Sequence, residues 1–403
     1  MDAGKLKATV RARIDAERPR LVTLARQIHA NPEPGFRETR ASGWLTGYLE
    51  EKGFAVERGI CRLRTAFRAS YGQGAPVIAL IAEYDALPGV GHACGHNISG
   101  VASVGAAVAC REVVDRTGGQ VCVIGTPAEE LYGGKVLMVK RGAFKGVDAA
   151  MMAHAGTANT ATTYALACQN INVEFFGKSA HAAARPEQGI NALEAMLLSF
   201  NGINSLRQHI RSSARIHGII TDGGRAPNVV PDHAAGSFIV RAEDDRYLDE
   251  LKARVLACFR AAATATGARL RYRWDPVRYA PMKNNLTIAR LFAANLESLG
   301  QPVALTNAGG ALGSTDMGNV SQVAPAIHAT VAIAPPGTLL HSPEFAAAAA
   351  TDAAMDGLCH AARMAATICA TGPAARHLAS TGRSCSYSHS TGPRWGPSSC
   401  SCL

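Results

Sequence analysis

The chain has 403 residues, of which 47% are hydrophobic and 18% are charged, and this composition excludes a disordered protein and provides for a large buried core. At roughly 150 residues per domain, the length predicts two or three domains. The net charge is +10, but basic and acidic residues are interleaved without a basic, aromatic-rich stripe. This pattern argues against a nucleic-acid partner and favours small anionic substrates.

The cellular compartment is constrained by apolar segments and cysteines. No apolar run reaches the roughly 18 residues of a transmembrane helix, and the N-terminal segment lacks the apolar core of a secretory signal. The eleven cysteines, an odd number, favour reduced thiols over a disulfide framework. We therefore expect a cytoplasmic protein without a membrane partner.

The first part of the chain alternates helical and strand patterns. Strands are expected at 54–56, 63–69, 77–81, 120–125 and 149–153. Helices are expected at 3–31, 37–52, 98–114 and 134–141. Short apolar strands that alternate with helices are typical of a largely parallel sheet covered on both faces. We predict an α/β catalytic domain whose first part is residues 1–167.

The order of elements changes near residue 168. The pattern then predicts strands at 168–177, 214–221, 234–242 and 268–274, and helices at 186–210 and 247–266. This β-α-β-β-α-β order is that of a ferredoxin-like unit. We predict an inserted domain at 168–282.

The α/β pattern resumes after the predicted insertion, at 283–372. Its elements are expected at 286–299 (helix), 326–333 (strand) and 343–369 (helix). Residues 373–403 are rich in Ser, Gly, Pro and Cys without periodicity, and we predict a disordered tail there.

Side chains that can bind a metal follow three predicted strands, and a fourth loop, ahead of a predicted helix, adds His341. They are Glu83, Asp85, His92, Cys94, His96, Glu129, Glu130, His154 and His341. Taken alone, His154 could be a structural histidine, and the Glu129–Glu130 pair could be a solvated helix start. In α/β proteins, however, sites form where loops leave the carboxyl ends of parallel strands. The shared placement of these residues therefore favours a metal site.

Six motifs, in this order, resemble those of the aminoacylase and hippurate-hydrolase type metallopeptidases. They are EYDALPGVGHACGHN, GTPAEELYGGK, GKSAHAAARPEQGINAL, GGRAPNVVPD, GSTDMGNVS and LHSPEF. The most similar branch contains a cysteine ligand and includes aminobenzoyl-glutamate hydrolase and the β-alanyl-lysine-type dipeptidases. The resemblance covers residues 20–365. It implies a catalytic domain with two divalent metal ions and a ferredoxin-like lid domain that mediates dimerisation.

The resemblance also implies the residues that hold the metals. The ligands would be Cys94, His96, Glu130, His154 and His341. Asp85 would orient one of these ligands. Glu83 stands where other branches have a histidine ligand, and His92 matches no ligand, so neither is assigned to a metal.

Catalytic and substrate-binding roles follow from the same resemblance. Glu129 would be the general base of amide hydrolysis. His181, in the lid, would donate a hydrogen bond to the oxyanion in the other subunit's site. Asn228 resembles a lid residue that contacts the substrate. Arg241 would pair with the substrate carboxylate, because its planar guanidinium suits that group, although an ordinary strand-surface arginine is an equal alternative.

A glycine-rich segment supplies further pocket residues. Gly313, Ser314 and Asp316 are expected to shape the substrate pocket. No Gly-x-Gly-x-x-Gly spacing follows a strand there, which argues against nucleotide binding.

We interpret the chain as a metal-dependent hydrolase that cleaves the amide bond of an N-acyl amino acid or a related amide with a free carboxylate. Zinc is the expected metal because the ligand set contains Cys, His and Glu, with manganese or cobalt as alternatives. We expect a homodimer formed through the lid. Two other functions stay open: a dipeptidase of the β-alanyl-lysine type, and a non-catalytic metal-binding subunit. Glu129 argues against the latter, which needs no base.

Overall fold

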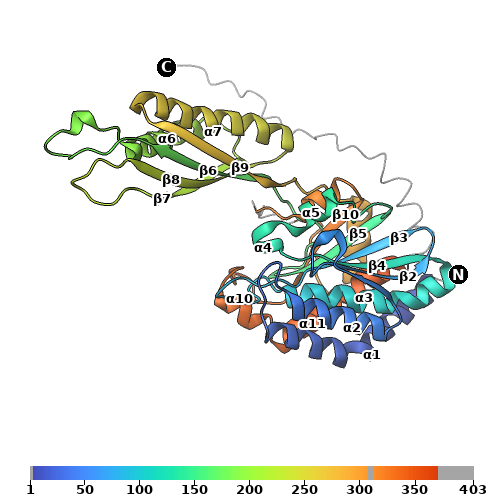
Figure 1. The fold of residues 1–403 in the computed structure, drawn as a ribbon. Coiled ribbons are helices and arrows are strands. Elements are labelled where there is room, and N and C mark those ends of the chain that lie inside the picture. The colour runs from blue at the N-terminus through green and yellow to red at the C-terminus, as the bar shows by residue number, and fades with distance from the viewer. Residues whose placement is uncertain (1–2, 307–312, 371–403) are drawn as a thin grey trace, which may run out of the picture.

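The computed structural model describes residues 3–306 and 313–370, which form two sheets with their helices (Figure 1). The tail predicted at 373–403 lies outside the described residues. Among the described helices, none is long and apolar enough to cross a bilayer.

The first sheet has the strand order β1-β2-β4-β3-β5-β10. Its strands are β1 (Ala55–Arg58), β2 (Phe67–Gln73), β3 (Val77–Ala82), β4 (Gly119–Gly125), β5 (Ala149–Gly156) and β10 (Ala326–Ala332). Strands β4, β3, β5 and β10 are parallel to one another. At one edge, β2 pairs antiparallel with β4, and β1 pairs antiparallel with β2. The expected α/β fold with a mostly parallel sheet is confirmed.

Helices cover both faces of this sheet. They are α1 (Ala3–His29), α2 (Thr39–Glu51), α3 (His96–Thr117), α4 (Glu129–Tyr132), α5 (Gly134–Lys140), α8 (Leu286–Glu297), α9 (Met317–Ser321), α10 (Pro343–Ala348) and α11 (Asp352–Cys369), with a 3-10 turn η1 (Ile60–Arg62). Along β3, Ile78 and Leu80 face the core of α1, α3 and α11, and Ala79 and Ile81 face the core of α5 and α9. Because both of its faces are buried, β3 is a continuous apolar run.

The second sheet is antiparallel, with the order β7-β8-β6-β9. Its elements are β6 (Ala167–Phe176), η2 (Pro186–Gln188), α6 (Ala192–Arg207), β7 (Arg215–Asp222), β8 (His233–Ala242), α7 (Asp245–Thr266) and β9 (Arg269–Tyr279). Helices α6 and α7 pack side by side on one face and share a separate hydrophobic core with the strands. This unit extends away from the α/β part (Figure 1), and below we call it the lid.

The bounds of several predicted elements differ in the structure. The helix expected at 186–210 begins at Ala192, because the Asn191 side chain accepts hydrogen bonds from the first helical N–H groups. The strand expected at 63–69 is β2, at Phe67–Gln73. The helix expected at 343–369 is two helices, since the Thr351 hydroxyl caps a new helix after α10.

Candidate active site

The predicted ligands come together at the carboxyl edge of the parallel sheet. Strands β4, β3 and β5 are neighbours, so the loops that leave them converge. The Sγ atom of Cys94 lies 3.5 Å from Nε2 of His154. Nε2 of His341 lies 3.4 Å from Oε2 of Glu130, and the His341 amide donates to the Ala93 carbonyl. These contacts join segments that are 60 and about 210 positions apart in the chain.

Gly95 makes the approach of Cys94 to β5 possible. Its φ angle is 73°, and a Cβ atom added to it would lie 2.4 Å from the Cβ of Ala155. Both the left-handed conformation and the close contact require glycine. The turn therefore places Cys94 and His96, on either side of the glycine, next to β5.

Among the described residues the donor atoms form four groups, of which two contain Glu129, once with His96 and Glu130 and once with Glu83 and Asp316, and the other two share Cys94. Of the two that share Cys94, one is Cys94, His96 and His154, and the other is Cys94, Glu130 and His341; within each group the donor atoms lie within 4.8 Å of one another. Two of these atoms, His96 Nε2 and Glu130 Oε1, are buried and form no hydrogen bond among the described residues. Buried polar atoms are rarely left without a partner, and two metal ions that share Cys94 would satisfy both.

Asp85 connects the two groups that share Cys94. Its Oδ1 lies 3.1 Å from Nδ1 of His96, and its Oδ2 accepts a hydrogen bond of 3.0 Å from the Glu130 amide. Burial alone would raise the pKa of Asp85, but the charge and hydrogen bond of His96 hold it below its ordinary value. Contact at Nδ1 leaves the Nε2 of His96 free for a metal, as is usual for histidine ligands.

The other donors also have environments that suit a metal. The Nδ1 of His154 lies 2.6 Å from the Ala155 carbonyl, and burial lowers the pKa of His154 to about 4, so the ring is neutral. Burial raises the pKa of the Cys94 thiol. A divalent cation is the partner that would favour its thiolate form.

Glu129 begins α4 after a strained turn. Ala128 has a φ angle of 61°, and its amide donates a 2.8 Å hydrogen bond to Oε1 of the buried Glu38. Removal of the Glu129 carboxyl from solvent raises its pKa well above the ordinary value, and the charges of Glu83 and Asp316 raise it further. A carboxyl group with a raised pKa is suited to take up and release a proton.

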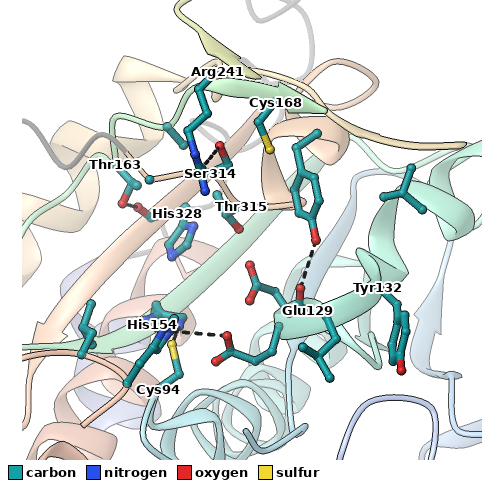
Figure 2. A pocket seen from close by; sticks show the side chains of 18 of the residues that line it. Cys94, Glu129, Tyr132, His154, Thr163, Cys168, Arg241, Ser314, Thr315 and His328 are labelled. Carbon is teal, nitrogen blue, oxygen red and sulfur yellow. Dashed lines mark hydrogen bonds and ion pairs between the residues drawn. The ribbon is translucent and has the colours of Figure 1, made fainter. Parts of the chain in front are cut away.

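A cavity of about 750 Å³ connects these residues with the base of the lid. Figure 2 shows Cys94 and His154 at one end and Arg241 at the other, with Glu129 between them. Arg241 donates a 2.7 Å hydrogen bond to the Ser314 hydroxyl, and both line the cavity together with Gly313. A volume of this size is typical of sites for small ligands.

His181 and Asn228 are absent from the described residues that line this cavity. The segments that contain them pair with each other. His181 forms a β-bridge with Val229, and the Ala182 N–H donates a hydrogen bond to the Asn228 carbonyl. The His181 segment follows the last residue of β6, and the Asn228 segment follows the last residue of β7. Both strands run antiparallel to β8, so both segments lie at the end of the sheet opposite to Arg241. Eight of the predicted site residues line the chain's own cavity, and Asp85 and His96 lie behind it in contact with Glu130, whereas His181 and Asn228 do neither.

Sequence reasoning missed a buried charge cluster behind the cavity. Lys135 is fully buried and its ammonium group contacts Glu83 and, at 2.8 Å, Asp316. Asp316, which was expected to shape the pocket, points into this cluster instead. His328 was also missed: it lines the cavity, and its ring centroid lies 5.2 Å from that of His154. The signal available in the sequence was that Lys135 and His328 each stand within an otherwise apolar segment.

Comparisons with known proteins agree with this geometry. The model of peptidase family M20/M25/M40 matches residues 79–363. The chain is 37% identical over 367 residues to the Xaa-Arg dipeptidase of Mus musculus, which covers 87% of this chain and 84% of that protein. It is 37% identical over 315 residues to a chain of the p-aminobenzoyl-glutamate hydrolase of Escherichia coli (strain K12), covering 72% of this chain and 64% of that protein.

A solved structure has the same fold. It is a dinuclear metal-binding peptidase of the M20 family from Bacillus subtilis, with a TM-score of 0.71 at 20% identity and coverage of 88% of this chain and 98% of that chain. The family match spans the predicted ligands from Cys94 to His341. The chain is thus a metal-dependent hydrolase of amide bonds and belongs to peptidase family M20/M25/M40.

Proposed function

We propose that this hydrolase cleaves the amide bond of N-acyl amino acids, or of related amides that carry a free carboxylate. The observation that carries the proposal is the cavity with Cys94 and His154 at one end, Arg241 at the other and Glu129 between them (Figure 2). An amide bond next to Glu129 would leave the carboxylate of the same substrate directed at Arg241.

Two divalent ions would be held by the two groups that share Cys94. The Cys, His and Glu donors suit zinc, with manganese or cobalt as alternatives. When bound, such ions polarise a carbonyl group and lower the pKa of water. The remaining chemistry belongs to Glu129, which takes a proton from the attacking water and delivers it to the leaving nitrogen. Tyr279 donates a 3.3 Å hydrogen bond to the Glu129 carbonyl and so holds this turn in place.

Arg241 would recognise the substrate carboxylate. It extends from the lid into the cavity and contacts only neutral partners, Ser314 and His217, and none of the described carboxylates lies within ion-pair distance. A guanidinium group without a protein anion is suited to bind one from the substrate.

A homodimer formed through the lid would supply His181 and Asn228 to the partner's site. Strand β7 is an edge of the lid sheet, and apolar residues of β7 and α6 are exposed there, among them Ile219, Leu197 and Leu198. An unpaired edge beside exposed apolar side chains favours association with another chain. We place this enzyme in the cytoplasm, with small amides and a second copy of itself as its partners.

The test is a comparison of paired substrates. N-acetyl, N-benzoyl and aminobenzoyl-glutamate amides are each assayed with a free α-carboxylate and with that group converted to a carboxamide. Metal-loaded enzyme should cleave the free acids, and Arg241→Met should lose at least about ten-fold in kcat/KM for the acids while the carboxamides change little. Arg278→Met is the matched control, because Arg278 is already paired with Asp245 and Asp249. Equal loss for acids and carboxamides would argue against this role.

A dipeptidase is the second candidate. Asp275 lines the cavity, with its backbone carbonyl bonded to Gln169 and its Oδ1 to the Val277 amide, and its carboxylate is the group that would receive the amino group or a cationic side chain of a dipeptide. One relative is named an Xaa-Arg dipeptidase. If this function holds, Asp275→Asn should reduce the cleavage of dipeptides with Arg or Lys and spare N-acetyl substrates. A metal-loaded protein that cleaves no member of either panel would instead support a non-catalytic role.

A further inference from the structure

We propose that Glu83 is a fourth protein ligand of the metal held by Cys94, His96 and His154. This inference rests on the proposed metal-dependent function and goes beyond the ligand set expected from the motifs, in which Glu83 had no metal role. It assigns different tasks to the two metal positions.

Three donor–donor distances within the site are close to those of a tetrahedral arrangement. Glu83 Oε2 lies 3.5 Å from His96 Nε2 and 3.9 Å from His154 Nε2, and His154 Nε2 lies 3.5 Å from Cys94 Sγ. Ligand atoms at ordinary zinc distances and tetrahedral angles are separated by roughly 3.3–3.6 Å. Glu83 Oε2 therefore lies close enough to both histidines to share one zinc ion with them, and Cys94 Sγ lies beside His154 on the same ion position.

The free oxygen of Glu83 has no other function in the structure. Glu83 is fully buried, and its Oε2 forms no hydrogen bond among the described residues. Leaving a buried charged oxygen without a partner costs at least about 1–3 kcal/mol. A metal cation at the position defined by His96 and His154 would remove this cost.

The other oxygen of Glu83 is fixed by Lys135. The Lys135 ammonium group contacts Glu83 Oε1 and Asp316 Oδ1, and the Lys135 amide donates to Asp316 Oδ2 at 2.9 Å. Glu83 cannot rotate away without breaking this buried contact, so Oε2 stays directed at the two histidines. The cluster also has two carboxylates and one ammonium group, and its excess negative charge is unfavourable without a further cation nearby.

Four protein ligands would close one metal position and leave the other open. His96 and Glu83 are fully buried and do not line the cavity, whereas the His341 side chain is 54% exposed and lines it with Glu130. Closed four-ligand sites are typical of structural metals, and an open position is typical of catalytic ones. The metal held by Cys94, Glu130 and His341 would then be the one that receives the substrate.

The test measures metal binding without reference to turnover. Metal-free protein is loaded with cobalt(II) and with zinc, and both stepwise affinities are determined by competition with a chromophoric chelator. Glu83→Gln should weaken one of the two affinities by at least the roughly 10- to 100-fold known for loss of an outer ligand partner. It should also change the visible d–d bands of one cobalt ion per chain, because those bands report the ligand number and geometry.

Glu17→Gln is the matched control, since Glu17 is also a buried carboxylate bonded to a lysine, Lys52, but lies between α1 and α2. It should leave both affinities and the cobalt spectrum unchanged. Glu83→Asp keeps a negative charge beside Lys135, but its shorter side chain moves the second carboxylate oxygen away from His96 and His154. It therefore gives the same test if Glu83→Gln does not fold. Unchanged affinities and spectra in a folded Glu83 variant would overturn the inference. Wild-type protein that binds neither metal would overturn the proposed function as well.

Discussion

Glu129 and Glu130 are neighbours with different predicted tasks. Only Glu130 belongs to the group with Cys94 and His341, while Glu129 lies near Glu83 and Asp316, whose charges raise its pKa. Glu129→Gln should therefore keep both metals and lose at least about 10²-fold in turnover, as expected when a general base is removed. The measurement is kcat together with metal content by elemental analysis. Full activity in this variant would mean that Glu129 is not the base.

Cys94 offers a test of ligation that needs no substitution. It is buried, with 8% of its surface exposed, and faces the other donors. A thiolate bound to a metal should resist alkylation, and removal of the metal by a chelator should speed its labelling. Peptide mass spectrometry measures the extent of alkylation at each cysteine separately. Cys122, which is buried in the sheet core, should stay unlabelled both with and without metal. Equal labelling of Cys94 with and without metal would refute its role as a ligand.

The prediction of individual residues depended on motif and placement. The cluster HACGH and the Glu129–Glu130 pair stand out because polar residues follow apolar strands. Lys135, by contrast, lies in a short helix among apolar residues, and its partners Glu83 and Asp316 are 52 and 181 positions away. No local pattern indicates such a partnership, because the contact exists only after the sheet has formed.

At the scale of elements, Glu17 joins α1 to α2. It accepts hydrogen bonds from the Tyr48 hydroxyl at 3.0 Å and from the Lys52 ammonium group at 2.7 Å. Burial alone would raise the pKa of Glu17, but these two partners lower it below the ordinary 4.5. A lowered pKa in the folded state means that the stabilisation is present above pH 4.5 and is lost as the pH falls through the folded value.

Glu17→Gln should therefore lower the free energy of unfolding by about 1.5–3 kcal/mol at pH 7. The difference from wild type should shrink as the pH is lowered past 4.5. Urea unfolding at several pH values measures both effects. Glu50→Gln is the control, because the Glu50–Arg58 pair is exposed and should contribute little. A difference that is independent of pH would show that the Glu17 carboxylate charge is not what stabilises the pair.

Element types followed from the sequence more readily than their ends. Apolar runs and helical periodicity predict the strands β3, β4 and β5 and the helices α1 and α3 close to their observed positions. Ends were missed where a single side chain decides them, as Asn191 does for α6 and Thr351 does for α11. Such caps depend on one hydrogen bond and leave no periodic signal.

At the scale of the whole molecule, the remaining question is how His181 reaches a site. It lies at the end of the lid sheet remote from Arg241 and does not line the chain's own cavity. A lost oxyanion donor commonly reduces turnover by about 10²–10³-fold. His181→Ala should therefore be nearly inactive while it keeps its metals and its oligomeric state.

Complementation tests whether the histidine acts across subunits. Inactive His181→Ala chains mixed with inactive Glu129→Gln chains should regain activity, because each heterodimer then has one site with an intact base and a histidine from the other chain. The control is each variant incubated alone under the same exchange conditions. No recovery, with subunit exchange verified by mass, would mean that His181 acts within its own chain or has no catalytic role.

The sequence by itself determined the α/β class, the ligand types and the strand-end positions of the predicted site, because apolar periodicity and motifs are local properties of the chain. Only the tertiary structure decided that Cys94 belongs to two donor groups, that Lys135 fixes Glu83 and that His181 lies far from its own chain's cavity. These relations depend on distances between segments that are remote in sequence. Such distances are set by the packing of two sheets, which no local pattern encodes.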